Sequence, residues 1–300
     1  MRHRARFLTL LILSLFFVIL EDSAQAAPEL KKLTDRVYAF IGEEGGTNSG
    51  FVVTDSGVVV IDTQGPRGLA LDLRKRIKEV TELPVIYVIN THYHGDHTFG
   101  NQYFREALAI ISHEETRSLL IEKDEPHRAR FKRFFGEDSL DEFTLTLPEI
   151  TFSDRLVLRA GSTTFEIVHT PPAHTYGDAY VYVPGEDVVF TGDLLYKGRL
   201  PWLHDGVFSG ALKAVDELIG LNASRYVPGH GDVAAKEGLL EYKKYLLDLD
   251  SEVRRLKGLG KGAEEIKKEI SLPAYEGYLM YREWLPLNAE KVYMELSGEE

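Results

Sequence analysis

The chain has 300 residues, of which 44% are hydrophobic, and its formal net charge is −12. This length allows one large domain or two small ones, and the apolar content is sufficient for a buried core. The acidic charge argues against a nucleic-acid partner, and the absence of cysteine excludes disulfides, thiolate metal ligands and lipid attachment through a thiol.

Residues 1–26 have the organisation of a secretory signal peptide. A basic start precedes an apolar run at positions 7–20, and Ala24 and Ala26 then fit the small-residue pattern of a cleavage site. We expect cleavage after Ala26. An uncleaved anchor is the alternative, but the run is shorter than the roughly 20 residues that span a bilayer. The sequence therefore predicts a periplasmic or secreted protein with no stable membrane span after cleavage.

From Arg36 onward, short β-rich runs are separated by turns. Residues 36–41, 49–54 and 57–62 are expected to be strands, and the glycine-rich loop at 42–48 is expected to form a flexible hairpin over a site. Residues 65–82 carry apolar side chains at helical spacing, and residues 84–90 form a continuous apolar strand. This strand leads directly into a histidine-rich motif.

The motif NTHYHGDHTFGN, at residues 90–101, places four metal-ligand side chains within six positions. Residues two apart in an extended segment point the same way, so we expect His92 and His94 to bind one ion. Asp96 and His97 follow the turn at Gly95 and are expected to face a second ion. Imidazole and carboxylate suit zinc and similar divalent metals. Each ion still needs further ligands from elsewhere in the chain.

After a predicted strand at 107–112, residues 113–149 are polar and rich in aromatic side chains. Two interpretations of this segment remain open. It forms one or two surface helices with Phe131, Phe134 and Phe135 packed inward, or it forms a lid that covers an apolar substrate.

The β pattern resumes at residue 150 and supplies three more donors near predicted strand ends. His174 lies in a proline-rich turn, Asp193 ends a strand, and His230 ends another. A helix is expected over 210–221, and the pattern is helical from Ala235 to the end. We predict one α/β domain at residues 27–234, after the signal peptide, with a C-terminal helical extension at 235–300 packed on the same domain.

The motif H-x-H-x-D-H, followed by AHTYGD, TGD and PGHG, resembles the metallo-β-lactamase superfamily from about residue 36 to residue 232. The resemblance implies an α/β fold, an αββα sandwich with a two-metal site at one edge of the sheets. It also implies the ligands of both metals. These are His92, His94 and His174 for the first metal, Asp96, His97 and His230 for the second, and Asp193 between the two.

Such a site implies a dinuclear zinc hydrolase, in which a hydroxide bridging two Zn²⁺ attacks a carbonyl carbon and Asp96 orients the nucleophile. The expected substrate is a small-molecule ester, thioester, lactone or amide, with β-lactams included. Histidine at position 97 resembles subclass B3 β-lactamases and glyoxalase II, and aspartate at 193 favours glyoxalase II-like hydrolases. The main alternative is an oxidoreductase similar to persulfide dioxygenases, with one Fe²⁺. The signal peptide opposes that alternative.

Several other side chains near the motifs are candidates for lesser roles. Asp178 is expected either to support a ligand or to form a turn. Three histidines are expected to be packed or at the surface rather than ligands: His113, His127 and His169. Five residues are candidates for substrate contact, with ordinary loop or packing roles as the alternative: Tyr93, Tyr196, Lys197, Trp202 and His204.

Overall fold

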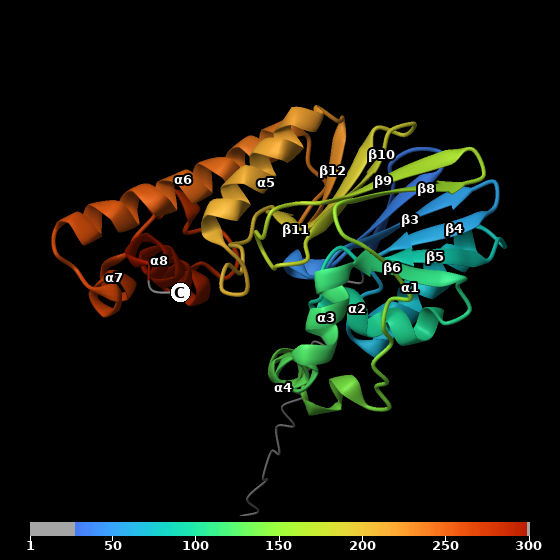
Figure 1. Ribbon diagram of the computed structural model, residues 1–300, viewed down its shortest axis with the longest axis horizontal. Coiled ribbons are helices and arrows are strands. Elements are labelled where there is room, and N and C mark those ends of the chain that lie inside the picture. Colours follow the sequence, from blue (N-terminus) through green and yellow to red (C-terminus); the bar gives the residue numbers. More distant parts are fainter. Residues whose placement is uncertain (1–27, 299–300) are drawn as a thin grey trace, which may run out of the picture.

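The computed structural model describes residues 28–298 (Figure 1). The predicted signal peptide lies outside the described residues. Between residues 28 and 298, no helix is both long and apolar enough to cross a membrane.

The strands of the described chain fall into two sheets. They are β1 (Glu29–Lys32), β2 (Val37–Ile41), β3 (Ser49–Thr54), β4 (Gly57–Ile61), β5 (Val85–Ile89), β6 (Ala109–His113), β7 (Ile150–Phe152), β8 (Arg155–Ala160), β9 (Thr163–His169), β10 (Ala179–Val183), β11 (Val188–Tyr196) and β12 (Arg225–His230).

The helices lie between and after these strands. The α-helices are α1 (Arg67–Val80), α2 (Gly95–Thr98), α3 (Glu114–Glu122), α4 (Asp124–Phe135), α5 (Phe208–Leu221), α6 (Lys236–Gly258), α7 (Ala263–Glu269) and α8 (Tyr281–Ser297). The 3₁₀ helices are η1 (Glu43–Gly45), η2 (Phe99–Phe104), η3 (Glu137–Leu140) and η4 (Pro273–Tyr275).

Sequence order and sheet order largely coincide. The first sheet runs β1-β2-β3-β4-β5-β6-β7, and the second runs β12-β11-β10-β9-β8. The first sheet is antiparallel from β1 to β4 and parallel from β4 to β7. In the second sheet only β11 and β12 pair in parallel. Each sheet therefore belongs to one continuous half of the chain.

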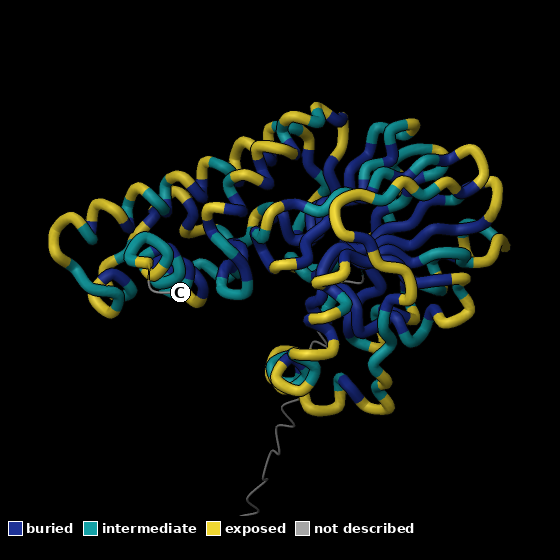
Figure 2. The backbone as a smooth tube through the Cα atoms, in the orientation of Figure 1, coloured by how far each residue is buried: buried dark blue, intermediate teal, exposed yellow. Residues whose placement is uncertain are grey.

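Apolar side chains fill the space between the two sheets, where Ile61 and Ile89 of the first meet Phe165 and Val181 of the second. Figure 2 shows the strands as the most buried part of the molecule. Strand β5, with the sequence VIYVI, is rich in the β-branched residues that suit a sheet interior.

Helices cover the outer face of each sheet. Helix α1 buries Ala70, Leu73 and Ile77 against the first sheet, at the three- and four-residue spacing of a helical face. Helices α5, α6 and α8 pack together beside the second sheet in one large apolar cluster. The layers are helix, sheet, sheet, helix, as expected for an αββα sandwich, and α6 to α8 extend from one side of it (Figure 1).

The aromatic segment after β6 contains two helices, α3 and α4, as one sequence interpretation proposed. Inward packing is correct for Phe131, which is 4% exposed, but wrong for Phe134 and Phe135, which are 58% and 47% exposed. Both of these residues lie in the last turn of α4, on a helix that stands apart from the sheets in Figure 1. Their surroundings are described below.

Candidate metal centre

The histidine-rich motif follows β5 and makes a sharp change of direction at Gly95. His94 has an extended backbone and caps the short helix α2, so His92 and His94 precede the helix while Asp96 and His97 belong to it. A side chain at Gly95 would meet the Phe99 ring at 2.6 Å. Glycine therefore permits the tight turn that separates the two pairs of donors.

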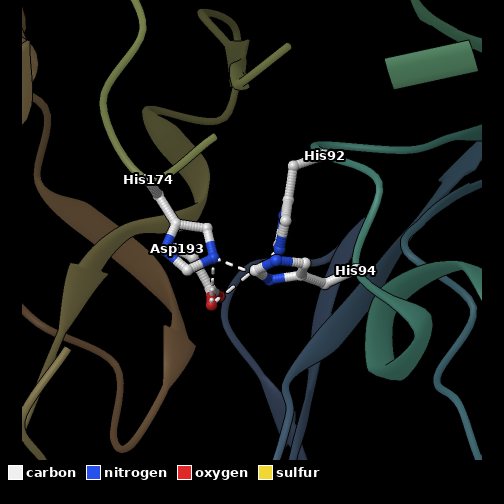
Figure 3. A group of neighbouring side chains, drawn as sticks. All are labelled: His92, His94, His174 and Asp193. Carbon is white, nitrogen blue, oxygen red and sulfur yellow. Dashed lines mark hydrogen bonds and ion pairs between the residues drawn. The ribbon is translucent and has the colours of Figure 1, made fainter. Parts of the chain in front are cut away.

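The first donor group comprises His92, His94, His174 and Asp193, all of them buried. One ligand atom from each lies within 4.8 Å of the others. Figure 3 shows the four side chains pointing toward a common centre. His92 and His94 follow the first sheet, whereas His174 and Asp193 come from the second.

The second donor group comprises Asp96, His97 and His230, whose ligand atoms are equally close to one another. Asp193 contacts members of both groups. Its Oδ2 lies 3.2 Å from Nε2 of His174, and its Oδ1 lies 3.1 Å from Nε2 of His97. The position of Asp193 is therefore that of a carboxylate between two adjacent sites.

Protein hydrogen bonds hold the histidines from the side away from the centre. Nδ1 of His174 lies 2.9 Å from the carbonyl oxygen of Trp202, and Nδ1 of His230 lies 3.0 Å from that of Gly45. A carbonyl oxygen only accepts, so both Nδ1 atoms carry the proton and donate it. Each Nε2 is left with a lone pair directed at the centre.

The remaining three ligand histidines follow the same rule. Nδ1 of His97 donates to Asp62, and Nε2 of His94 donates to Asp205 at 3.1 Å. The Thr91 hydroxyl donates its proton to Asp62 and so accepts from Nδ1 of His92 at 3.0 Å. In their neutral form, all five rings therefore present an unprotonated nitrogen to the centre.

This arrangement brings the lone pairs of unprotonated ring nitrogens close together, with no N–H or O–H group between them to donate a hydrogen bond. Nδ1 of His94 and Nε2 of His174 lie 2.8 Å apart, although each ring donates from its other nitrogen. Nε2 of His92, Nε2 of His97 and Oδ1 of Asp193 are buried and have no hydrogen-bond partner among the described residues. Buried groups of this kind require a partner, and divalent cations supply it. The residues fit bound divalent metal ions.

The pKa values of His92, His94 and Asp193 agree with this charge pattern. His97 differs, because burial lowers its pKa but the surrounding carboxylates, Asp193 first, outweigh burial and raise the pKa well above its usual range. Burial lowers the pKa of His94 to about 4 and holds the pKa of His92 well below its usual range. Burial by itself raises the pKa of Asp193, but His230 and His97 outweigh it and hold the pKa well below the usual range. Asp193 is thus an anion and His92 a neutral base at neutral pH, as metal ligands must be.

A cavity of about 270 Å³ opens onto the centre. Its polar residues include Asp96, Asp193 and His230, and most of its wall is apolar. The lining residues are Gly46, Thr47, Gln64, Pro66, Leu69, His94, Asp96, His127, Arg130, Phe131, Phe134, Phe135, Asp193, Tyr196, Arg199, Trp202, His230 and Trp284.

Only some of the five residues predicted for substrate contact line this cavity. Tyr196 and Trp202 line the cavity, whereas Tyr93, Lys197 and His204 do not. Tyr93 is 2% exposed. Nζ of Lys197 faces the carbonyl oxygen of Val233 at 3.4 Å.

The remaining predictions concern residues beside the ligands. Asp178 accepts hydrogen bonds from the backbone and hydroxyl of Thr175, so its observed contacts are those of a turn-forming residue. His113 and His169 stack on each other at 3.7 Å, and His127 packs at the cavity wall. None of these three histidines belongs to either donor group.

Sequence reasoning missed the acidic residues that orient the ligands. Asp62 directly follows β4, and Asp205 directly follows His204. Each carboxylate touches a ligand histidine, His97 for Asp62 and His94 for Asp205. The position of Asp62 at the end of an apolar strand was an available signal. Asp205 had no such signal, because it lies in a loop of irregular structure.

The family is shown by comparison with known sequences. The sequence model of the Metallo-beta-lactamase superfamily matches residues 42–230, so the chain belongs to this superfamily. The matched segment contains all seven residues of the two donor groups. Members of the superfamily are mostly hydrolases. The cluster of His and Asp side chains in this chain implies divalent metal ions.

Two curated relatives show the range of this likeness. The chain is 24% identical over 258 residues to a metallo-beta-lactamase type 2 from Elizabethkingia meningoseptica, a match that covers 82% of this chain and 94% of the relative. It is 25% identical over 201 residues to the 2,4-dinitroanisole O-demethylase subunit alpha from a Nocardioides species, with 66% and 54% covered. The matched part therefore spans about half the length of the demethylase subunit.

Solved structures share the fold at low sequence identity. A metallo-beta-lactamase from Pontibacter korlensis has a TM-score of 0.62 and 21% identity, with 73% of this chain and 99% of that chain covered. A double mutant of a sec-alkyl sulfatase has a TM-score of 0.73 and 19% identity, with 91% and 51% covered. The architecture is therefore that of the metallo-β-lactamase fold.

Proposed function

We propose that this protein is a dinuclear zinc hydrolase that cleaves an ester, thioester, lactone or amide bond of a small molecule, with β-lactams among its candidate substrates. The observation that carries the proposal is the second donor group, Asp96, His97 and His230, next to the first. A centre for a single ion would leave these three buried or half-buried side chains without a role.

The chain offers a complete set of ligands for two ions. His92, His94 and His174 would hold one and Asp96, His97 and His230 the other, with Asp193 between them. Two adjacent Zn²⁺ lower the pKa of water and polarise the oxygen of a carbonyl group. Histidine at position 97 supports a relationship to subclass B3 β-lactamases and glyoxalase II, and aspartate at position 193 favours glyoxalase II-like hydrolases.

Two further side chains have definite tasks at the cavity floor. Oδ2 of Asp96 accepts a hydrogen bond from the Thr47 hydroxyl at 2.6 Å, which fixes the carboxylate where it can orient a nucleophile as a hydrogen-bond acceptor. The Tyr196 hydroxyl donates to Oδ2 of Asp193. Burial, followed by the charge of Asp193, raises the pKa of Tyr196, so the phenol stays protonated at neutral pH and can donate.

The fold alone does not identify the bond that the protein cleaves. One relative is named as a β-lactamase, another as an O-demethylase subunit and a structural neighbour as an alkyl sulfatase. Such variety on one fold means that function must be tested at the site. A periplasmic or secreted location and a small-molecule substrate complete the proposal. The location depends on the signal-peptide pattern of residues 1–26.

The deciding experiment is the metal content of the purified mature protein, measured by plasma mass spectrometry without added metal. We expect two zinc ions per chain, together with turnover of at least one member of a panel of p-nitrophenyl esters, thioesters, lactones and cephalosporins. One iron per chain, with oxygen consumption in the presence of a persulfide, would replace this proposal with the dioxygenase alternative.

A further inference from the structure

Helix α4 forms one wall of the cavity above the metal centre. It contributes His127, Arg130, Phe131, Phe134 and Phe135 to the lining. The rings of Phe134 and Phe135 are among the most exposed large apolar groups of the described chain, yet both face this cavity. Apolar surface exposed at a binding site is a feature of ligand recognition.

The position of α4 is fixed by packing at its centre. Phe131 is buried, with its ring 5.0 Å from that of Phe99 and 4.4 Å from that of Phe135. A Cβ atom at Gly65 would lie 2.6 Å from the Phe131 ring. The glycine therefore makes room for Phe131. Phe131 anchors the helix beside the backbone that follows β4.

One carboxylate oxygen joins Arg130 of α4 to the ligand His94. Oδ2 of Asp205 accepts from Nη1 of Arg130 at 2.6 Å, from Nε1 of Trp202 at 2.8 Å and from Nε2 of His94 at 3.1 Å. Arg130 also lies over the Trp202 ring, 5.6 Å from its centre. Any shift of Arg130 therefore acts on the carboxylate that orients a ligand histidine.

Another part of the cavity wall is also aromatic. Trp202 and Trp284 both line the cavity, with their ring centres 5.5 Å apart. A molecule whose reacting group lies near Asp193 therefore has apolar surfaces beside it, from α4 and from this pair. Each methylene group buried against such surfaces can raise affinity up to about fourfold.

We propose that α4 binds the apolar part of the substrate through Phe134 and Phe135, and that the Arg130–Asp205 ion pair positions this wall relative to His94. The substrate class is then a small molecule with an alkyl chain or aromatic ring attached to its reacting group. This inference names the substrate class of the hydrolase proposed above and rests on that function.

The test measures binding and needs no turnover. Straight-chain carboxylates from butanoate to decanoate are titrated into the purified protein by calorimetry. We expect the affinity of the wild-type protein to rise with chain length. In the double variant Phe134→Ser/Phe135→Ser, the gain in affinity for each two added methylene groups should be at least threefold smaller than in the wild type. Both side chains are exposed, so the variant is expected to fold.

Ile121→Ser is the matched control, because Ile121 is 50% exposed on the neighbouring helix α3 and does not line the cavity. It should keep the wild-type dependence on chain length. An affinity that does not depend on length in the wild type would overturn the proposal. The same dependence in the wild type and the double phenylalanine variant would also overturn it.

The positioning role of Arg130 has its own readout. Arg130→Met should reduce the dependence on chain length and also weaken retention of metal against a chelator, because Asp205 loses a donor. Arg133→Met, an exposed change on the same helix, should alter neither quantity. Identical chelator curves for Arg130→Met and wild type would contradict the link to His94. Both readouts measure binding and not catalysis. Failure of the hydrolase proposal can therefore be told apart from failure of the proposal that α4 binds the apolar part of the substrate.

Discussion

Oδ2 of Asp62 lies 2.8 Å from Nδ1 of His97, and both side chains are buried. The same carboxylate accepts from the backbone and hydroxyl of Thr91, the residue that precedes His92. Asp62 itself has a left-handed backbone, with φ of 57°. A buried residue held in a strained backbone conformation indicates a specific structural or functional role. Here the role is to orient His97 directly and His92 through Thr91.

Asp62→Asn should therefore weaken metal binding without changing a ligand. Removing the charged acceptor of a ligand histidine lowers metal affinity by about 10- to 100-fold. Competition with a chelator, followed by metal analysis, measures the change. Asp35→Asn, in an exposed turn before β2, serves as the control and should behave as wild type. Equal metal affinity in the two variants would show that Asp62 has no orienting role.

Gly229→Ala should displace Asp193. A Cβ atom at position 229 would lie 1.8 Å from Oδ1 of Asp193, closer than any contact allows. We expect the variant to bind less than one metal ion per chain and to lose turnover. Gly220→Ala on helix α5 is the matched control, because nothing lies within 4 Å of its added Cβ. This control should raise the free energy of unfolding by about 0.5–1 kcal/mol. A Gly229→Ala protein with full metal content would disprove the displacement.

His92→Ala and Asp193→Ala test the two kinds of ligand separately. His92→Ala removes a member of the first donor group alone, whereas Asp193→Ala removes the carboxylate that contacts both groups. We expect each to abolish turnover of any carbonyl substrate, with the larger loss of metal in Asp193→Ala. Metal content and initial rates are measured on the same preparations. Full activity in either variant would remove that residue from the mechanism.

The stability of the protein should fall below pH 6.5 partly because of His127. Burial, then the charge of His94, lowers the pKa of His127 to about 3. The unfolded chain has a histidine pKa near 6.5, so between these values the unfolded state binds the extra proton and stability rises with pH. The contribution is up to about 1.4 kcal/mol per pH unit within this window.

His127→Gln isolates this contribution, because the amide oxygen can replace Nε2 as the acceptor for the backbone N–H of Gly95. Denaturant titrations at pH 7, 6 and 5 give the free energy of unfolding. We expect the loss between pH 7 and 5 to be about 2 kcal/mol smaller in the variant than in wild type. Parallel curves for the two proteins would show that His127 has the same pKa in the folded and unfolded chains.

Individual strands and helices were predictable because local patterns and burial agree, whereas the order of layers was implied only by the resemblance to the superfamily. The apolar strand before the motif and the helix at 65–82 both appear, as β5 and α1. The donors also carried a local signal, since most of them lie in a turn or at the end of a strand. Asp193 was expected to end a strand, but β11 continues past it to Tyr196 with an irregular register after Gly192. The structure brings His92, His94, His174 and Asp193 together from positions up to 101 residues apart in number.

The contacts around the ligands could not be predicted, because they are made between segments with no sequence pattern in common. Arg130 meets Asp205 from a helix 75 positions away, and only the folded chain brings them together. His204 was a candidate for the site, but the neighbouring Asp205 makes the contact with His94. Phe134 and Phe135 were ambiguous for a related reason, since an exposed aromatic residue on a helix has the same spacing as a buried one.

The donor groups draw on both sheets, and each sheet comes from one continuous half of the chain. His92, His94, Asp96 and His97 belong to the first half, and His174, Asp193 and His230 to the second. Ion binding is therefore thermodynamically linked to the docking of the two halves, since neither half alone holds a full coordination shell. Bound ions would therefore join the two halves of the sandwich at this edge, and loss of the ions would weaken that junction.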